Sequence, residues 1–425
     1  MKVVIMAGGK GTRIASVRNN IPKPMMPVGG KPVLEHEISC LADQGYTDIT
    51  LVIGHMGDII REYFGNGRKF GVSISYFEEK EPLGTGGALF QMPDILQDDF
   101  FLLNGDIMLD IDFKRMEKYH REKGGWVTLF THPNDHPGDS ALISADSGKR
   151  ITGWINKEDE RTIYKNRVNA GIHVISPKLL KERNLSGRVD LDREMLKPLV
   201  AAGKMYVYDS PEYVRDMGTP ERYHRVCEDY ESGKIKSRNL RLRQKAVFID
   251  RDGTINQYRG FIKRTEDMVL LEGAAKAISK INQSGYLAIV VTNQPVIARG
   301  DCTFAELERI HDQMETLLGM EGAWVDDIFF CPHHPDKGFA GERTEYKFDC
   351  DCRKPKPGLL FLAAEKYNID LGRSYMAGDS ASDIAAGNAA GCRSIYIGKK
   401  EVPQAAYAAC DSLLDFVQSH FLRIG

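Results

Sequence analysis

Residues Lys245–Thr254, with the sequence K-A-V-F-I-D-R-D-G-T, decide the fold of this chain. Four apolar residues, Ala246–Ile249, predict a short buried strand, and Gly253 predicts a turn directly after it. Between them stand Asp250 and Asp252, two carboxylates at the end of a strand where open α/β sheets usually place their chemistry. Asp-Gly is also a common turn, so this stretch alone leaves a purely structural role open.

The composition predicts a soluble globular protein of two or more domains. The 425 residues are 42% hydrophobic and 27% charged, and 57 Lys and Arg against 59 Asp and Glu give a net charge of −2. This balance favours neither nucleic acid nor a membrane surface as a partner. The N-terminal apolar run is too short for a signal peptide, and no stretch is long enough to span a bilayer. Eight cysteines without a secretory signal indicate a reducing compartment, and we expect a cytoplasmic protein.

The N-terminal half opens with a predicted strand and a glycine-rich loop. Lys2–Ala7 is a nearly continuous apolar run, typical of a parallel strand covered on both faces, and G-G-K-G-T-R follows it. The loop has neither the Walker nor the dinucleotide-binding spacing. Its glycines would still let backbone N–H groups approach phosphates, and prolines on both sides of Lys23 stiffen the backbone that carries this cation. The candidate phosphate-binding residues of the loop are Gly8, Gly9, Gly11, Thr12 and Arg13.

The order of motifs in this half resembles that of the sugar-phosphate nucleotidyltransferases. G-G-K-G-T-R is followed by P-K-P at 22–24, by P-V at 27–28 and by K-P-V-L-E at 31–35. The resemblance implies nucleotidyl transfer, in which a sugar 1-phosphate oxygen attacks the α-phosphate of a nucleoside triphosphate in line and pyrophosphate leaves. Catalysis would then depend on positioning and on charge neutralisation by Arg13, Lys23 and Mg²⁺.

The same resemblance implies the other site residues of this half. Asp106, at the end of a predicted strand over 100–103, and Asp216, in a segment similar to the family's W-x-D-I-G-T-P-E, would bind Mg²⁺. Trp154–Glu158 stands where the family has E-K-P, and only Lys157 matches it. Ser16 replaces a family proline after the glycine-rich loop. The residues implied to contact the nucleotide or the sugar are Gly84, Thr85, Gly86, Lys157, Asn169 and Gly171.

The second half adds further polar side chains to the opening stretch. A predicted strand over 286–291 ends in T-N-Q, R-K-P-K-P-G follows at 353–358, and a predicted strand over 375–378 ends in an aspartate. Together with D-x-D-G-T, this order resembles the haloacid dehalogenase superfamily of phosphotransferases. The polar residues at these places are Thr292, Asn293, Gln294, Lys354, Asp379 and Asp383.

The resemblance implies a covalent mechanism. Asp250 would attack phosphorus and form an aspartyl-phosphate, while Asp252 would protonate the leaving alkoxide and then activate water. Lys354 and Thr292 would steady the phosphate charge, and Asp383 would orient Lys354 rather than bind metal. The implied Mg²⁺ ligands are Asp250, the carbonyl of Asp252, and Asp379.

A set of cysteines and histidines lies between these motifs. C-P-H-H is followed by C-D-C, which supplies four soft and borderline ligands suited to tetrahedral Zn²⁺. A closed set of four predicts a structural site that holds the loop 336–348. His334 competes with His333 as a ligand, and free structural cysteines are the alternative. The predicted ligands are Cys331, His333, Cys350 and Cys352.

Within the superfamily, the second half resembles the D-glycero-D-manno-heptose 1,7-bisphosphate phosphatases. The stretches D-R-D-G-T-I-N, T-N-Q-x-x-I-A-R-G, C-P-H-H-P and C-D-C-R-K-P-K-P-G carry this resemblance, and histidinol-phosphatases share much of it. Only about forty residues separate Asp250 from Thr292, too few for an inserted cap domain. Pro295-Val296 and Ser380 depart from the family pattern. We expect substrate recognition at Arg353 and Tyr258.

Both halves together predict an α/β chain with two Rossmann-like domains, at 1–232 and 245–425. A polar, basic linker is predicted at 233–244; it could also be a nucleic-acid-binding arm, but it lacks aromatic residues. A phosphatase that leaves a sugar 1-phosphate would supply a transferase that consumes one. We therefore expect a bifunctional enzyme of nucleotide-activated heptose synthesis, with GMP as the favoured nucleotidyl group.

Two alternatives stay open at this point. The phosphatase half could act on histidinol phosphate or another small phosphomonoester, with the transferase half using a different sugar 1-phosphate. Alternatively, the N-terminal half could be a non-catalytic sensor of sugar nucleotides. The sequence determines neither the nucleobase nor the oligomeric state, so a homo-oligomer is also left open.

Overall fold

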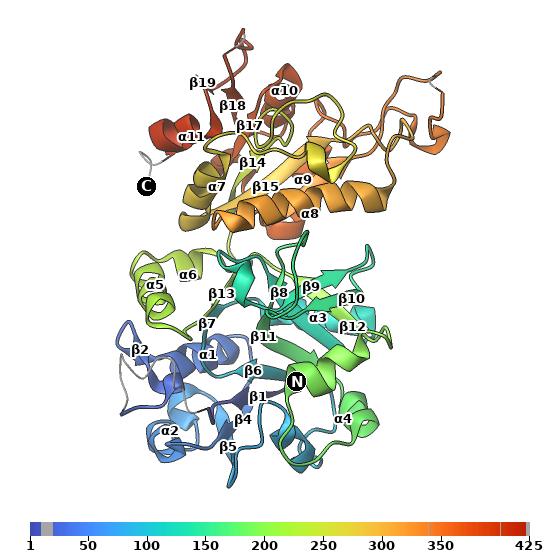
Figure 1. Ribbon diagram of the computed structural model, residues 1–425. Helices are drawn as coiled ribbons and strands as arrows, with labels where there is room; N and C mark the ends of the chain where they lie inside the picture. The colour runs from blue at the N-terminus through green and yellow to red at the C-terminus, as the bar shows by residue number, and fades with distance from the viewer. Residues whose placement is uncertain (10–19, 339, 400, 422–425) are drawn as a thin grey trace. The chain divides into compact units, whose positions relative to one another are not determined.

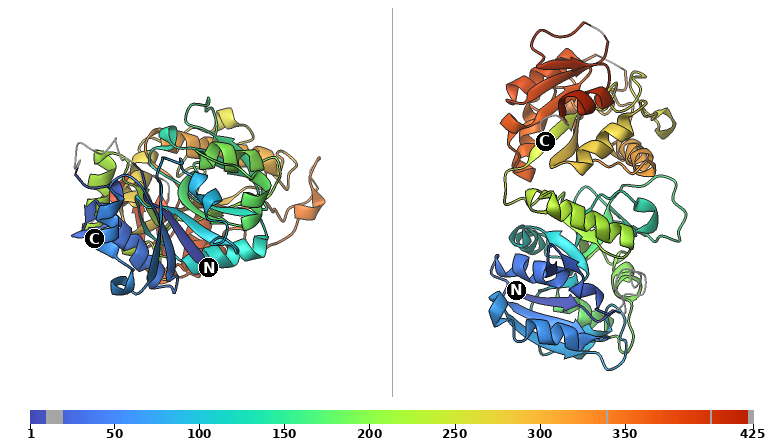
Figure 2. Two further views of the ribbon diagram at one scale, coloured as in Figure 1. Left: turned by 90° about the horizontal axis from the view of Figure 1, so that it is seen from below. Right: turned by 90° about the vertical axis from the view of Figure 1, so that its left-hand side faces the viewer.

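The computed structural model describes residues 1–9, 20–338, 340–399 and 401–421. The chain forms two compact units (Figures 1 and 2). Among the described residues, none of the helices has the length and apolar character that a bilayer crossing requires. Unit 1 comprises Met1–His132, Ile143–Asn156 and Val168–Asn239, and unit 2 comprises Pro133–Leu142, Lys157–Arg167 and Leu240–Gly425.

Unit 1 is built on a mixed sheet with the strand order β10-β9-β11-β6-β1-β4-β5, and β8 and β12 extend it from β11. Strands β6, β1, β4 and β5 run parallel, so their carboxyl ends meet at one edge, whereas β11 runs antiparallel to β6. The strands of this sheet are β1 (Lys2–Met6), β4 (Asp48–Ile53), β5 (Ser73–Glu78), β6 (Phe100–Asn104), β8 (Val127–His132), β9 (Leu142–Ala145), β10 (Ile151–Ile155), β11 (Val168–Ile175) and β12 (Met205–Asp209).

Helices and two small ribbons complete unit 1. Helix α1 places Leu34, Ile38 and Leu41 against Val3 and Ile5 of β1, because residues three and four apart share one helix face. The helices are α1 (Val33–Ala42), α2 (Gly57–Phe64), α3 (Phe113–Lys123), α4 (Pro177–Arg183), α5 (Pro220–Glu231) and α6 (Lys234–Ser237). The ribbons pair β2 (Pro27–Val28) with β3 (Lys31–Pro32), and β7 (Ile107–Asp110) with β13 (Tyr213–Asp216).

Unit 2 contains, within its described residues, a sheet of six parallel strands in the order β16-β15-β14-β17-β18-β19. The strands are β14 (Lys245–Ile249), β15 (Tyr286–Asn293), β16 (Asp327–Cys331), β17 (Tyr375–Gly378), β18 (Arg393–Ile397) and β19 (Ala408–Cys410). The helices are α7 (Ala274–Gln283), α8 (Phe304–Met320), α9 (Gly358–Tyr367), α10 (Ala381–Ala389) and α11 (Leu413–Phe416).

Strand β14, the predicted strand of the opening stretch, lies inside this sheet between β15 and β17. Val247 and Ile249 pack into a core shared with α7 and α8, while Ala246 and Phe248 pack into a second core with α9. Successive side chains of a strand point to opposite faces, so four consecutive apolar residues are what a strand covered on both faces requires. The α/β fold of both units is therefore confirmed.

The segment 233–244, expected as a polar linker, contains two anchoring side chains. Helix α6 lies within it, and Ile235 is buried in the core that unit 1 builds around Met26 and Val226. Leu240 is buried in a core of unit 2 together with Phe248. Two apolar residues therefore anchor this segment, Ile235 in unit 1 and Leu240 in unit 2. The polar and basic composition of the segment did not predict this anchoring.

Candidate active sites

The first candidate site lies at the carboxyl end of β14. The Asp250 N–H donates to Ala377 O at 2.9 Å, which ties the residue to β17. The Asp250 carboxylate accepts a hydrogen bond from Lys354 Nζ at 2.6 Å. Lys354 is buried, donates also to Val291 O at 2.8 Å, and pairs with Asp383 at 2.6 Å. The contact with Asp383 is the one expected of a residue that orients Lys354.

Burial and neighbouring charges have opposite effects on the pKa values of Asp250 and Lys354. Burial raises the pKa of Asp250, against the opposing effect of the Lys354 ammonium. Burial acts to lower the pKa of Lys354, but the Asp250 and Asp383 carboxylates hold this pKa above its usual value. The site therefore keeps a cation beside a poorly solvated carboxylate, an arrangement suited to a phosphate group.

The second aspartate of the opening stretch is held by its neighbours. Arg251 donates to Asp252 from Nε at 3.2 Å and from Nη2 at 2.9 Å, and Asn256 donates at 3.1 Å. Gln294 donates to Asp252 at 2.8 Å and to Thr292 Oγ1 at 2.9 Å. The fully buried guanidinium of Arg251 was missed at the sequence level. The position of Arg251 between Asp250 and Asp252 was the sequence signal that could have identified it.

The strand-end motifs are also joined to one another. The Asn293 amide donates to Lys354 O, and the Lys354 N–H donates to Asn293 Oδ1, both at 3.0 Å. Gly253 has φ +87°, and a Cβ there would lie 2.1 Å from Asp379 Oδ2, so only glycine fits this approach. The predicted residues Asp250, Thr292, Lys354 and Asp379 thus gather at one edge of the sheet.

Three carboxylates at this edge fit a hard divalent cation. Asp250, Asp379 and Asp383 can each present an oxygen such that all three lie within 4.8 Å of one another. Mg²⁺ is bound by one or two carboxylates together with substrate phosphate oxygens and water. Asp250 and Asp379 are the predicted ligands of this set; a contribution from Asp252 stays a prediction.

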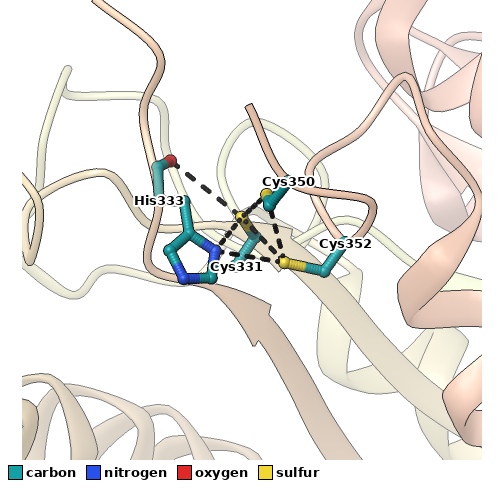
Figure 3. A group of neighbouring side chains, drawn as sticks. All are labelled: Cys331, His333, Cys350 and Cys352. Carbon is teal, nitrogen blue, oxygen red and sulfur yellow. Dashed lines mark hydrogen bonds between the residues drawn. The ribbon is translucent and has the colours of Figure 1, made fainter. Parts of the chain in front are cut away.

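Three cysteines and one histidine form a second cluster in unit 2 (Figure 3). The Sγ atoms of Cys331, Cys350 and Cys352 lie 3.3–3.5 Å apart, and His333 Nδ1 lies 3.3 Å from Cys352 Sγ. Zinc–sulfur bonds of about 2.3 Å place tetrahedral ligand atoms roughly 3.7 Å apart, so the four atoms fit Zn²⁺. The cluster contains His333 and not His334, whose Nδ1 instead accepts from the Asp336 N–H.

The two residues expected to recognise the phosphatase substrate differ in their surroundings. Arg353 donates to His333 O at 3.2 Å, so its guanidinium is tied to the backbone of the Cys/His cluster. Tyr258 is 72% exposed, which leaves its ring available to a ligand but held by few neighbours. Their roles stay predictions.

The second candidate site is a pocket of about 870 Å³ in unit 1. It lies at the edge where the parallel strands of the sheet end, and it contains six of the predicted residues. Gly11, Thr12 and Arg13, predicted to bind phosphate, lie outside the described residues. The predicted residues that line the pocket are Gly8, Gly9, Lys23, Gly84, Thr85 and Asp106.

Cations hold both carboxylates that were expected to bind metal in unit 1. Lys23 Nζ pairs with Asp106 Oδ2. Asp216 accepts from Arg222 at 2.9 and 3.0 Å and from the Gly218 N–H at 2.8 Å. Burial acts to raise the pKa of Asp216, but Arg222 and this N–H hold it below its usual value. Strand β13 places Asp216 opposite Ile107, the first residue of β7, and Asp106 directly precedes it, so the pairing of β7 with β13 brings the two carboxylates to the same end of this ribbon.

The expected sugar-contacting segment forms a bulge. The pairing of β11 with β8 shifts register between Asn169 and His173, and Asn169 Oδ1 accepts from the Gly171 N–H at 3.1 Å. Asn169 Nδ2 donates to Asp192 at 3.3 Å. Asp192 was missed at the sequence level. Burial raises its pKa to about 6, with a further contribution from Asp190.

The second glycine-rich turn packs against the chain that leads to Asp192. Gly84 has φ +78°, and a Cβ there would lie 2.4 Å from Val189 O. Gly86 N donates to the same oxygen at 3.0 Å, and Thr85 Oγ1 accepts from the Leu191 N–H at 2.8 Å. Lys157 falls in a segment of unit 2 and is exposed, so its predicted sugar contact stays untested.

Comparisons with known proteins match each unit to a different enzyme class. The family model for nucleotidyl transferases matches residues 2–233, and the HAD-hydrolase-like model matches residues 351–415. A mannose-1-phosphate guanylyltransferase from Mycobacterium tuberculosis is 32% identical over 242 residues, which are 56% of this chain and 67% of that enzyme. This chain thus spans about two thirds of the length of that relative.

The C-terminal half is similar to a phosphatase over nearly the whole length of that protein. The D-glycero-beta-D-manno-heptose-1,7-bisphosphate 7-phosphatase of Escherichia coli is 37% identical over 180 residues, 41% of this chain and 92% of that enzyme. A solved structure, the D,D-heptose 1,7-bisphosphate phosphatase of B. bronchiseptica complexed with magnesium and phosphate, is 32% identical with a TM-score of 0.38, covering 43% of this chain and 100% of that one. This chain belongs to the nucleotidyl transferase family through residues 2–233 and to the haloacid dehalogenase-like phosphatases through its C-terminal half, and so combines two enzyme classes.

Proposed function

We propose that the chain is a bifunctional cytoplasmic enzyme of nucleotide-activated heptose synthesis. Unit 2 removes the 7-phosphate of D-glycero-D-manno-heptose 1,7-bisphosphate. Unit 1 then joins the heptose 1-phosphate to a nucleotidyl group, with GMP favoured, and releases pyrophosphate. The order follows from the chemistry, because the anomeric phosphate spared in the first reaction is the attacking group of the second.

The phosphatase reaction uses groups that lie within hydrogen-bond reach of one another. Asp250 attacks phosphorus, and Lys354, 2.6 Å from its carboxylate, neutralises the phosphate oxygens as the P–O bond of the ester breaks. Asp252 gives a proton to the leaving sugar oxygen and then takes one from the water that hydrolyses the aspartyl-phosphate. Arg251 and Gln294 orient Asp252 for both transfers. Asp250 and Asp379 would hold Mg²⁺, which would supply charge neutralisation at the phosphate when bound, while Asp383 pairs with Lys354 and orients it.

The transferase reaction needs no covalent intermediate. Gly8 and Gly9 leave the strand end open to a triphosphate, and Lys23 places a cation beside Asp106. Asp106 and Asp216 are the candidate holders of Mg²⁺, which neutralises the phosphate charge when bound. Asn169, Gly171 and Asp192 form the polar surface proposed to bind sugar hydroxyls, with Asp192 as an acceptor.

The Cys/His cluster is proposed as a structural Zn²⁺ site. Four soft and borderline donors converge and leave no place for a substrate ligand among them. Arg353, which donates to His333 O, is adjacent to the catalytic Lys354. Zn²⁺ bound here would therefore stabilise the loop that carries the lysine.

The single observation that carries the proposal is that the Asp250–Lys354–Asp383 cluster and the Lys23–Asp106 pocket occur in one chain. Incubation with heptose 1,7-bisphosphate, GTP and Mg²⁺ should yield phosphate, pyrophosphate and a GDP-heptose, identified by mass spectrometry. Asp250→Asn should stop phosphate release but leave transfer from preformed heptose 1-phosphate intact. Asp106→Asn should stop nucleotidyl transfer but leave phosphate release from the bisphosphate intact.

Other product patterns would contradict this assignment. Phosphate release from histidinol phosphate in preference to the heptose bisphosphate would assign another substrate to unit 2. Failure to form any nucleotide sugar with all four common nucleoside triphosphates would overturn the transferase assignment. Transfer that Asp106→Asn leaves unchanged would overturn the proposed role of this pocket.

A further inference from the structure

Two segments of unit 2 lie, in the sequence, between strands of unit 1. Pro133–Leu142 follows directly after β8, and Lys157–Arg167 directly precedes β11. Val168, the first residue of β11, pairs with His132, the last residue of β8. Both strands therefore lead into unit 2 from the same position of their ladder. Contacts that hold these two segments within unit 2 thus act on the start of β11.

Side chains continue the pairing of the two strands into the two segments. The Asn166 amide donates to Asn134 O at 2.8 Å, and the Asn134 N–H donates to Asn166 Oδ1 at 3.3 Å. Both residues are buried. An amide side chain that bonds a backbone N–H and a backbone C=O makes the same two contacts as a neighbouring strand. The two segments are therefore fixed to each other just beyond the pair of Val168 and His132.

Helix α8 holds the segment that leads to β11. Glu315 Oε2 accepts from the Asn166 N–H at 3.0 Å and from Arg167 Nη1 at 3.1 Å. Next to it on the helix, Thr316 Oγ1 accepts from the Tyr164 N–H at 2.9 Å. The side chains of Arg167 and Glu315 are each 3% exposed, so water does not replace this ion pair without opening the packing around it.

Arg167 also connects the segment to the sheet of unit 2. Its Nη2 donates to Asp326 O at 3.1 Å. The Asp326 carboxylate accepts from the Ala288 N–H of β15, and the Asp326 N–H donates to Ala288 O, both at 2.7 Å. Hydrogen bonds thus run without a break from β15 to the residue directly before β11.

The sugar surface of unit 1 begins two residues after this ion pair. Asn169 follows Arg167 and Val168, and the register of β11 against β8 shifts between Asn169 and His173. A strand at a bulge lacks part of its ladder of hydrogen bonds, so its position depends more on what holds its ends. A displacement of about 1 Å in a group that positions a substrate can lower a rate by about 100-fold.

We infer that Glu315, a residue of the phosphatase unit, is a positioning residue for the transferase. It holds Asn166 and Arg167, and so fixes the start of β11 and the placement of Asn169. The inference rests on the proposed nucleotidyl transfer and adds to it a residue from the other half of the sequence. Substitutions in α8 should therefore change the affinity for sugar 1-phosphate in a reaction that unit 1 carries out.

The test measures both reactions of the full chain with substitutions at Thr316. Thr316→Val removes the hydroxyl that holds Tyr164 but keeps the shape of the side chain, whereas Thr316→Ser keeps the hydroxyl. Thr316→Val should raise the KM for heptose 1-phosphate about threefold, with the KM for GTP and the phosphatase kcat unchanged. Thr316→Ser should restore the wild-type KM.

Substitutions of Glu315 should have the larger effect. Glu315→Ala should raise the same KM by about 10- to 100-fold, because Asn166 and Arg167 both lose their acceptor. Glu315→Gln should give an intermediate KM, since its amide oxygen can still accept from the Asn166 N–H. Glu308→Gln, which changes an exposed carboxylate of the same helix, is the matched control and should leave all constants unchanged.

Two results would overturn the inference. A KM for heptose 1-phosphate that Thr316→Val and Glu315→Ala leave unchanged would show that α8 does not position the sugar surface. A loss of phosphatase kcat equal to the loss in transfer would show a general defect of α8. If circular dichroism shows that Glu315→Ala does not fold, the comparison of Thr316→Val with Thr316→Ser decides.

Hydrogen exchange followed by mass spectrometry separates the inference from the proposed function. The Gly171 N–H donates to Asn169 Oδ1, so peptides that contain Gly171 report on the bulge without any substrate. These peptides should exchange about tenfold faster in Glu315→Ala than in wild type or Glu308→Gln. If the wild type forms no nucleotide sugar, the proposed function fails, and the faster exchange still supports the inference. Unchanged exchange in Glu315→Ala would refute it.

Discussion

The proposed catalytic carboxylates of the two units, Asp250 and Asp106, differ in how far their surroundings exclude water. In unit 2, the side chain of Asp250 is 11% exposed and that of its partner Lys354 is 2% exposed. In unit 1, the corresponding values are 32% for Asp106 and 10% for Lys23. Both pairs join a strand-end carboxylate to a lysine, so the difference lies in burial rather than in residue type.

The difference in burial matches the role proposed for each carboxylate. Asp250 must form a bond to phosphorus, and a nucleophile shielded from water reacts without first losing a hydration shell. Asp106 only has to hold charge beside a triphosphate, and its pocket must stay open to a large polar substrate. The greater burial of Asp250 therefore fits the covalent role proposed for it, and the greater exposure of Asp106 fits its proposed charge-placing role.

The largest expected effect concerns the buried nucleophile. Asp250→Asn should lower phosphate release by about 10⁴-fold or more, because the amide cannot form the acyl phosphate. Transfer from preformed heptose 1-phosphate, measured by pyrophosphate release, should change by less than about twofold. Asp349→Asn, an exposed carboxylate paired with Lys356, is the control. Residual phosphatase activity within about tenfold of wild type would refute the covalent role.

The corresponding substitution in the unit 1 pocket should affect the other reaction, nucleotidyl transfer. Asp106→Asn should reduce pyrophosphate release by about 10³-fold, since it removes a charged group that faces the triphosphate. Phosphate release from the bisphosphate should stay at the wild-type rate. Loss of both activities in this variant would contradict the assignment of one chemistry to each unit.

A smaller effect is expected from the guanidinium behind Asp252. Arg251→Met should lower the phosphatase kcat by about 100-fold with little change in KM, because Asp252 loses the fork that orients it. Arg251→Lys should recover only part of the rate, since an ammonium cannot donate from a planar fork. A shifted pH profile of kcat would show an effect through Asp252. A decrease in kcat together with an increase in KM by a similar factor would indicate a general packing defect.

Removal of one proposed zinc ligand should affect stability more than chemistry. Cys352→Ser should reduce bound zinc, measured by plasma mass spectrometry, and lower the Tm of the phosphatase transition by about 5 °C or more. Cys392→Ser, a buried thiol outside the cluster, is the control for loss of a sulfur atom. A wild-type chain that contains no zinc after expression in zinc-supplemented medium would argue against the site.

The smallest expected effect concerns the sugar surface of unit 1. Asp192→Asn should raise the KM for sugar 1-phosphate by about tenfold and leave kcat nearly unchanged. Burial raises the pKa of Asp192 to about 6, so the wild type should lose this acceptor as the pH falls through 6. The ratio of KM values between variant and wild type should therefore approach one at low pH. A ratio independent of pH would remove Asp192 from sugar binding.

The strand-end residues could be predicted because parallel strands leave their last residues at one edge. Asp250, Thr292 and Asp379 lie at the ends of predicted apolar strands, and the parallel sheet brings them to one edge. Lys354 lies in the loop before α9, and its place was predicted from the resemblance to the haloacid dehalogenase superfamily rather than from an apolar run. The Cys/His ligands followed from their spacing and donor chemistry. His333 was already predicted over His334 from the sequence, and the structure agrees, because it places His334 against Asp336 instead.

The contacts of the residues that were missed depend on tertiary structure that the sequence pattern does not specify. Arg251 lies between two conspicuous aspartates, but its burial against Asp252 follows from the shape of the turn. Asp192 comes after an irregular segment and reaches Asn169 through a β-bulge.

The central position of β14 has a consequence for co-translational folding. Its Asp250 is tied to Ala377 of β17 and reaches Lys354 and Asp383, all made much later in synthesis. Every segment of unit 1, by contrast, has been made once residue 239 is added. Domains fold in order as the chain emerges, so nascent unit 1 can form its pocket while the phosphatase nucleophile still lacks its partners. The activity that we propose to act second on the sugar should therefore be the first to mature.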